Sequence, residues 1–143
     1  MASKNVETLR AAHESWNRRD FDGLLRNVAD NVTYADRARG STMNNKQMFR
    51  EFVEAWAEAF PNGRIVNPQY IDAGNIVIAQ FTMEGANEGS MMGMKPTGRR
   101  ASVSFCEIVN YDKNGMAVSG NLYYDQYNLL TQLGHIKPIA TAA

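Results

Sequence analysis

The chain has few of the residues that build disulfide frameworks and common metal sites. It contains one cysteine, Cys106, and two histidines, His13 and His135, among 143 residues. A single thiol excludes an intrachain disulfide and fits a reducing compartment. Neither the CxxC nor the HExxH spacing occurs, so we expect no metal site built from thiolates or imidazoles.

The chain also lacks an excess of charge of either sign and any long apolar run. Its 15 Lys and Arg residues balance its 15 Asp and Glu residues, so no net field favours nucleic acid or an anionic membrane. No stretch of about 18 apolar residues could cross a bilayer, and no signal peptide is recognisable. We therefore expect a cytoplasmic protein without nucleic-acid or membrane partners.

The chain does have enough apolar residues for one hydrophobic core. Hydrophobic residues make up 44% of the sequence and charged residues 21%, which is typical of a soluble globular protein. The length suits one domain with room for a ligand pocket. Because no repeat, low-complexity run or linker interrupts it, we expect a single domain over residues 1–143.

The first part of the sequence has helical periodicity. Apolar residues recur every three or four positions after Ser3, a candidate N-cap. Asp20 can cap a second short helix that runs through Val28, and residues 31–36 alternate like a strand. A longer helix is expected after Asn45, ending at a Phe-Pro-Asn-Gly sequence.

Beyond residue 63 the hydrophobic pattern changes to a period of two. Residues 64–73 and 75–84 are rich in strand-forming residues and are joined at a Gly-Asn turn. Residues 102–111 and 116–124 form a second pair of the same kind. Helices followed by hairpins predict an α+β fold, with a curled antiparallel sheet over a helical layer.

The segment between the two hairpins, residues 85–100, reads GANEGSMMGMKPTGRR and includes Met91. Its glycines and methionines are compatible with a mobile apolar lid over a pocket, because methionine adapts to irregular partners. They are equally compatible with an ordinary exposed connection that tucks some methionines underneath.

Four segments carry a resemblance to a known family. GSMMGMKPTGRR (89–100) and DQYNLLTQLG (125–134), supported by WNRRDFDGLLRNVADNV (16–32) and AFPNGR (59–64), resemble the SnoaL-like polyketide cyclases of the nogalonic acid methyl ester cyclase type. The resemblance implies the cone-shaped α+β barrel of nuclear transport factor two and ketosteroid isomerase, with a central apolar cavity. It also implies no cofactor, and a homo-oligomer (dimer or tetramer) packed through sheet faces. The implied activity is that of a lyase or isomerase of antibiotic biosynthesis, which closes a ring in a hydrophobic polyketide by an intramolecular aldol step.

The resemblance places the family's acid/base aspartate on Leu122, which cannot transfer a proton. Asp125 lies three residues later, at the start of a segment with helical spacing. In the preceding strand it is out of phase with Leu122 and Tyr124, so its side chain is expected to turn away. We therefore interpret Asp125 as an N-cap in preference to a catalytic acid.

Two other residues are candidates for acid–base catalysis. Glu107 interrupts the apolar face of its strand, at a position that holds a histidine in the cyclases. A buried acid marks a functional candidate, although this face could instead meet an arginine of a partner subunit. His13 lies on the apolar stripe of the first helix, where a packed core histidine is the usual role. If His13 and Glu107 met across the cavity, they could form an acid–base pair.

Several apolar and aromatic residues are expected to line the substrate cavity, with ordinary core packing as the alternative for each. Trp16 and Phe52 align with positions that shape the cavity in the cyclases. The full set of expected lining residues is Trp16, Tyr34, Phe52, Trp56, Met91, Leu122 and Tyr124. The tyrosines among them could donate to a substrate carbonyl. Asp36, beside two arginines, is expected to form an exposed ion pair.

Three functions remain open from these residues. The first is cofactor-independent ring closure by acid–base chemistry through Glu107. The second is a template that holds a polyene for pericyclic closure, with the rate gained mainly from orientation. The third is a small-molecule binding protein without catalysis, motivated by the missing aspartate.

Overall fold

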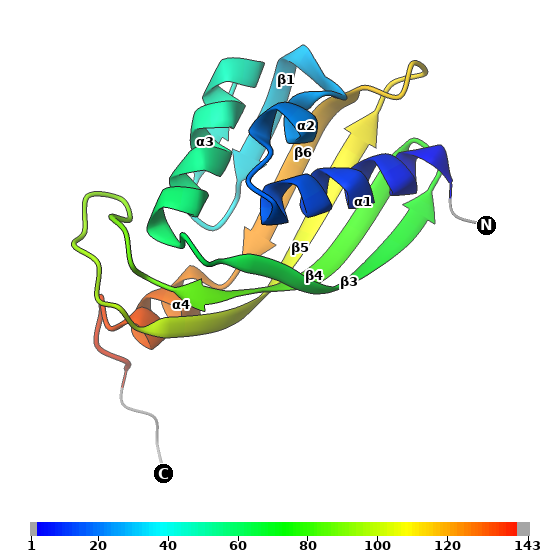
Figure 1. Ribbon diagram of the computed structural model, residues 1–143. Coiled ribbons are helices and arrows are strands. Elements are labelled where there is room, and N and C mark those ends of the chain that lie inside the picture. The colour runs from blue at the N-terminus through cyan, green and yellow to red at the C-terminus, as the bar shows by residue number, and fades with distance from the viewer. Residues whose placement is uncertain (1–2, 140–143) are drawn as a thin grey trace.

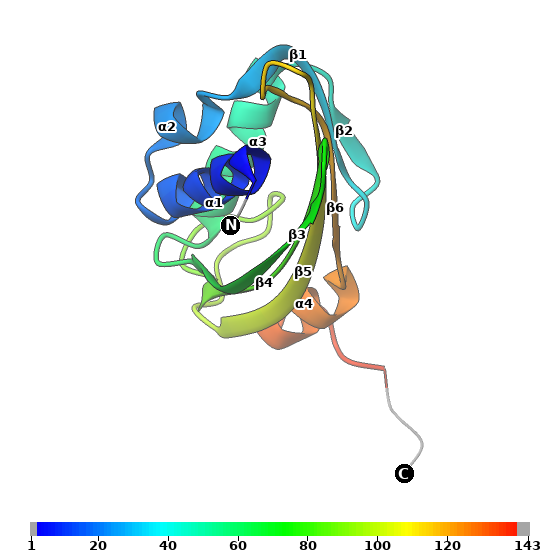
Figure 2. The same ribbon diagram turned by 90° about the vertical axis from the view of Figure 1, so that its right-hand side faces the viewer.

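The computed structural model describes residues 3–139, which fold as helices packed inside a curved sheet (Figures 1 and 2). Helices α1, α2 and α3 lie on the concave side of the sheet, as Figure 2 shows. The predicted α+β fold, with a curved sheet wrapped on N-terminal helices, is therefore confirmed. The elements are α1 (Lys4–Asn17), α2 (Phe21–Leu25), β1 (Val28–Asp36), β2 (Ser41–Met43), α3 (Lys46–Ala59), β3 (Arg64–Ala73), β4 (Ile76–Ala86), β5 (Arg100–Tyr111), β6 (Ala117–Tyr124) and α4 (Gln126–Leu133).

The sheet has six strands in the order β2-β1-β6-β5-β4-β3. Strands β3 to β6 form a meander of antiparallel neighbours, and β1 pairs with β2 in the same sense. The pairing of β1 with β6 is parallel, which differs from the purely antiparallel sheet expected from the hairpins. The difference arises because α3 carries the chain from β2 to the far edge of the sheet, and the meander then returns to β1.

Side-chain caps begin the helices where the sequence predicts them. Ser3, Asp20 and Asn45 each accept a hydrogen bond from a backbone amide in the first turn of α1, α2 and α3. Asp125 does the same for α4, accepting from the amide of Asn128 at 2.9 Å. The interpretation of Asp125 as an N-cap is confirmed.

The second helix is shorter than predicted. It ends at Leu25, and Val28 is the first residue of β1, where it is buried and pairs with Ala117. A β-branched residue fits the sheet better than a helix end.

In the part of the chain that the structure describes, no helix is long and apolar enough to cross a membrane.

The connection between β4 and β5 packs against the end of α3. Asn87 is fully buried, and its side-chain amide donates to the carbonyl oxygens of Ala59 (3.2 Å) and Gly89 (2.8 Å). A Cβ atom at Gly89 would lie 1.8 Å from the carbonyl oxygen of Glu58, so only glycine allows this close approach. Met91 is buried in the core beneath the connection. Residues 85–100 do not border the cavity between the sheet and the helices, and their arrangement is that of an ordinary connection with a methionine tucked under it.

Candidate functional site

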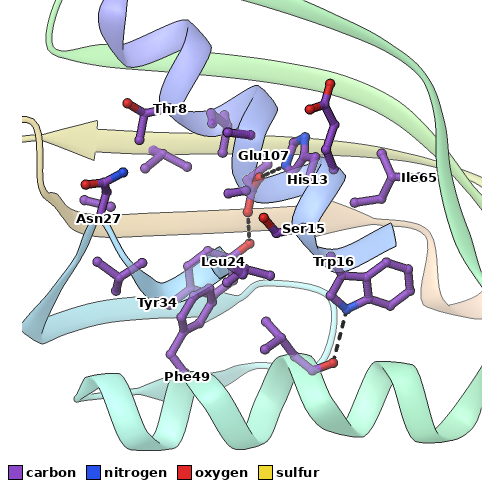
Figure 3. Close-up of a pocket in the computed structure, with 18 of the residues that line it drawn as sticks. Thr8, His13, Ser15, Trp16, Leu24, Asn27, Tyr34, Phe49, Ile65 and Glu107 are labelled. Atoms are coloured by element: carbon purple, nitrogen blue, oxygen red, sulfur yellow. Dashed lines mark hydrogen bonds and ion pairs between the residues drawn. The ribbon is translucent and has the colours of Figure 1, made fainter. Parts of the chain in front are cut away.

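A cavity of about 270 Å³ lies between the concave face of the sheet and helices α1 to α3 (Figure 3). Its wall is built mainly of aliphatic and aromatic side chains from these three helices and from β1, β3, β4, β5 and β6. Sites for small molecules usually measure about 300–1,000 Å³. At about 270 Å³ the cavity lies just below this range, which suits a small organic molecule or part of a larger one.

Most of the predicted site residues border this cavity. Those that do are His13, Trp16, Tyr34, Phe52, Trp56, Glu107 and Leu122. Met91 and Tyr124 do not, which corrects the expectation for both. Tyr124 lies at the end of β6, where its ring stacks on Phe105 with 4.5 Å between centroids and its phenol donates to Asp36.

Three acids border the cavity, and Glu107 is the buried one, since Glu14 and Asp20 are exposed. Glu107 lies in the middle of the inner face of β5, and its side chain is 10% exposed. One carboxylate oxygen, Oε1, is 2.7 Å from Nε2 of His13, and the other, Oε2, accepts a hydrogen bond from the phenol of Tyr34 (Figure 3). The carboxylate thus points into the molecule, and the interpretation that it meets an arginine of a partner subunit is wrong.

His13 is held on both of its ring nitrogens. Nε2 contacts Glu107, and Nδ1 is 2.7 Å from the phenol oxygen of Tyr70 on the edge strand β3. Burial raises the pKa of Tyr70 to about 12, so this phenol keeps its proton at neutral pH. When the imidazole is neutral, Tyr70 donates to Nδ1 and Nε2–H donates to Glu107. His13 therefore has no free nitrogen for a substrate.

Tyr34 is a permanent donor to Glu107. Burial, and then the neighbouring Glu107 carboxylate, raise the pKa of Tyr34 well above its usual value. The phenol therefore stays protonated over the physiological range. With one donor on each oxygen, the Glu107 carboxylate is fixed in place, and each oxygen keeps a second lone pair.

The Tyr34 ring has room because its cross-strand neighbour is glycine. Tyr34 pairs with Gly120 of β6, and a Cβ atom there would lie 2.6 Å from two carbons of the ring. We expect Gly120→Ala to push the ring away from Glu107 and to lower the free energy of unfolding by about 1–3 kcal/mol, the usual cost of overpacking. Urea denaturation measures this, with Ser104→Ala on the exposed face of β5 as the control. Wild-type stability in Gly120→Ala would contradict the close packing.

Asp36 does not form the exposed ion pair that was predicted. It is completely buried, and it accepts hydrogen bonds from the phenol of Tyr124 (2.8 Å) and the backbone amide of Arg39 (3.0 Å). The Arg39 guanidinium lies 3.7 Å from the same carboxylate. Asp36 ends a strand that is flanked by β2 and β6, and it does not border the cavity. Its role is structural.

Sequence reasoning missed two tyrosines of the site, Tyr70 and Tyr111. Tyr70 gave no signal, because its contact with His13 spans 57 residues and depends on how α1 crosses β3. Tyr111 did give a signal, since strand alternation places it on the same face as Glu107.

Within residues 3–139, no group of three or more His, Cys, Asp and Glu side chains is placed to hold a metal ion.

Comparisons with known proteins agree with this architecture. A sequence model described as SnoaL-like polyketide cyclase matches residues 6–133. No curated protein matches the chain by sequence.

Many solved structures share the fold, at low sequence identity. A protein from Jannaschia sp. CCS1, named a "putative SnoaL-like polyketide cyclase", has a TM-score of 0.85 at 17% identity, covering 97% of this chain and 99% of that one. AclR from Streptomyces galilaeus, named a "putative hydroxylase", has a TM-score of 0.81 at 20% identity, covering 96% and 85%. TerC, co-crystallised with polyporic acid, has a TM-score of 0.74 at 18% identity, covering 92% and 99%.

Proposed function

The chain belongs to the SnoaL-like polyketide cyclase family, and we propose that it closes a ring in a polyketide-type small molecule by acid–base chemistry, without a cofactor. One observation carries the proposal. Glu107 is a buried carboxylate on the wall of an apolar cavity, and His13 and Tyr34 hold it in place. Burying an acid is costly, and its position inside a ligand-sized cavity supports a chemical role.

The position of Glu107 supports its use as a substitute for the missing aspartate. The residue at the family's aspartate position, Leu122, is the direct cross-strand partner of Glu107 in the β5–β6 pairing. Side chains at paired positions have Cβ atoms about 4.5–5.5 Å apart. A carboxylate at 107 therefore reaches nearly the same part of the cavity as one at 122 would.

In the proposed mechanism Glu107 is the general base. It takes a proton from a carbon next to a substrate carbonyl, and the resulting enolate carbon attacks a second carbonyl of the same molecule. A carbon–carbon bond forms, the second carbonyl oxygen becomes an alkoxide, and this oxygen receives the proton back from Glu107. A substrate that fills the cavity displaces water from it, which strengthens the electrostatic interactions that stabilise developing charge.

His13 and Tyr34 are positioning residues in this scheme. Both nitrogens of His13 are engaged by Glu107 and Tyr70, so His13 acts through the carboxylate and not on the substrate. Tyr34 fixes the second oxygen. The two donors hold the base in one orientation, which is the preorganisation that proton abstraction from carbon requires.

The apolar wall supports a hydrophobic substrate. Trp16, Phe52 and Trp56 offer aromatic surfaces to the cavity, and these are suited to a planar or partly cyclised polyketide. The co-crystallisation of TerC, which has a similar fold, with polyporic acid supports a small organic molecule as the occupant here.

The proposal can be tested with 2-tetralone, a bicyclic ketone whose C–H bonds beside the carbonyl are acidic. In deuterium oxide, we expect the wild-type protein to accelerate deuterium uptake at these carbons above the rate in buffer, as measured by proton NMR. Binding is verified in parallel by the fluorescence of Trp16 and Trp56. A ketone that binds without accelerated exchange would contradict acid–base catalysis, and would favour a template or a binding protein.

A further inference from the structure

One phenol that borders the cavity has no partner. Tyr111 lies on the inner face of β5, four residues after Glu107, and is 4% exposed. The phenols of Tyr34, Tyr70 and Tyr124 are bonded to Glu107, His13 and Asp36 respectively. Among the residues that the structure describes, none forms a hydrogen bond with the Tyr111 hydroxyl.

The Tyr111 hydroxyl is open to an occupant of the cavity. In residues 3–139 the only buried side-chain polar atom that is both sealed from solvent and unpartnered is Nε1 of Trp56. The Tyr111 hydroxyl is therefore unpartnered without being sealed, and the residue borders the cavity. Water reaches this hydroxyl while the cavity is free. When a bound molecule displaces the water, a hydroxyl left without a hydrogen bond costs free energy, and an oxygen of the bound molecule would satisfy it.

The chemistry of the group identifies what it would bind. Burial first, and then Glu107 and Tyr70, raise the pKa of Tyr111, so it stays a neutral donor. The Glu107 carboxylate nearby disfavours an anionic ligand group beside it. A neutral acceptor remains, and in a polyketide that acceptor is a carbonyl oxygen.

The position of Tyr111 indicates which carbonyl this is. Four residues along a strand span about 13 Å, so the Tyr111 backbone is far from that of Glu107. Tyr111 pairs with Ala117, whose amide donates to the Asn27 carbonyl at 2.8 Å. Figure 3 shows Asn27 at one end of the cavity, Trp16 at the other and Glu107 between them. The Tyr111 backbone therefore lies at the Asn27 end, while its phenol is close enough to Glu107 and Tyr70 for both to raise its pKa.

We propose that Tyr111 is a specificity-determining residue that donates a hydrogen bond to a substrate carbonyl in the cavity, other than the carbonyl beside the carbon on which Glu107 acts. Such an anchor sets which carbon of a chain with several carbonyls lies against Glu107. The identification of the substrate as a polyketide rests on the proposed function. The hydrogen bond from Tyr111 to a carbonyl does not depend on catalysis by Glu107.

Two ligands of matched shape test the hydrogen bond. The ketone 1-tetralone and the hydrocarbon tetralin differ in a carbonyl, and both are bound to wild-type protein and to Tyr111→Phe by calorimetric titration. We expect the preference for the ketone over the hydrocarbon to fall by about two- to tenfold in Tyr111→Phe, the value of one neutral hydrogen bond. Tetralin affinity should not change, and the carbonyl stretching band of bound 1-tetralone should lie at lower frequency in the wild type.

The control is Tyr123→Phe, which removes a phenol from the exposed face of β6 and should leave both affinities unchanged. Because the Tyr111 hydroxyl has no protein partner, Tyr111→Phe should be at least as stable as the wild type. An unchanged ketone preference, or an unchanged carbonyl frequency, would overturn the proposal. If exchange of 2-tetralone does not need Glu107 while the ligand pair behaves as expected, only the proposed catalysis fails.

Discussion

Glu107→Gln should lower the protein-catalysed exchange of 2-tetralone by about 10²- to 10⁴-fold, which is the usual contribution of a positioned general base. Glutamine has nearly the shape of glutamate, but its amide cannot accept a proton from carbon at neutral pH. NMR rates in deuterium oxide measure the loss, and Glu58→Gln, on the exposed side of α3, is the matched control.

The variant should fold as the wild type does, because the hydrogen-bond network can reverse its direction. The oxygen of the introduced amide can accept from Tyr34, and the NH₂ group of that amide can donate to Nε2 of His13. The imidazole then carries its proton on Nδ1 and donates to Tyr70, since a phenol oxygen accepts as well as donates. We therefore expect a melting temperature within a few degrees of the wild type.

Exchange at the wild-type rate in Glu107→Gln would show that Glu107 is not the base. Activity would then have to arise from the shape of the cavity, and Trp16, Phe52 and Leu122 would become the residues to vary. A variant that fails to fold would be followed by Glu107→Asp. The shorter carboxylate keeps the chemistry but withdraws from His13 and Tyr34, so its exchange rate should lie between those of wild type and Glu107→Gln.

The fold was largely predictable because its signals are local. Helix caps, turn residues and the change of period from helical to alternating depend on neighbours in sequence. The parallel pairing of β1 with β6 was not predictable in this way, since it joins segments more than 80 residues apart (Tyr34 and Gly120). Nothing near either strand specifies the other.

The candidate site was predictable only in part. Strand alternation alone singled out Glu107 as an acid on an apolar face. Its contact with His13 spans 94 residues. The sequence therefore showed that the two residues could form an acid–base pair, but not that they meet. The cross-strand relation of Glu107 to Leu122 follows from the register of the β5–β6 hairpin, which turn residues suggest but do not determine to the residue.

Asp36 shows why local charge patterns mislead. Two arginines beside it suggested a solvated surface, but long cationic side chains can cover a buried acid while their charged ends stay near water. The Arg39 guanidinium lies over the Trp56 ring at 4.4 Å and 3.7 Å from Asp36. The same sequence pattern is therefore compatible with an exposed pair and with a covered one.

Asp36→Ala should destabilise the protein by about 3–5 kcal/mol, the usual cost of removing one partner from a buried ion pair. The change leaves the Arg39 guanidinium without its carboxylate and leaves Tyr124 with only the side-chain oxygen of Gln126, at 3.2 Å. Urea denaturation measures the loss. Asp36→Asn keeps an acceptor for the Tyr124 phenol and should lose less.

The contrast between the two buried acids separates structural from chemical roles. Asp36 is fully buried and contacts Tyr124 and Arg39. Its loss should therefore lower the free energy of unfolding by a large share of the roughly 5–15 kcal/mol typical of a domain. Glu107 faces the cavity, so its replacement by glutamine should lower exchange and spare stability. If Asp36→Ala instead unfolded at the wild-type urea concentration, burial would not distinguish the two acids. The assignment of Glu107 would then rest on exchange rates alone.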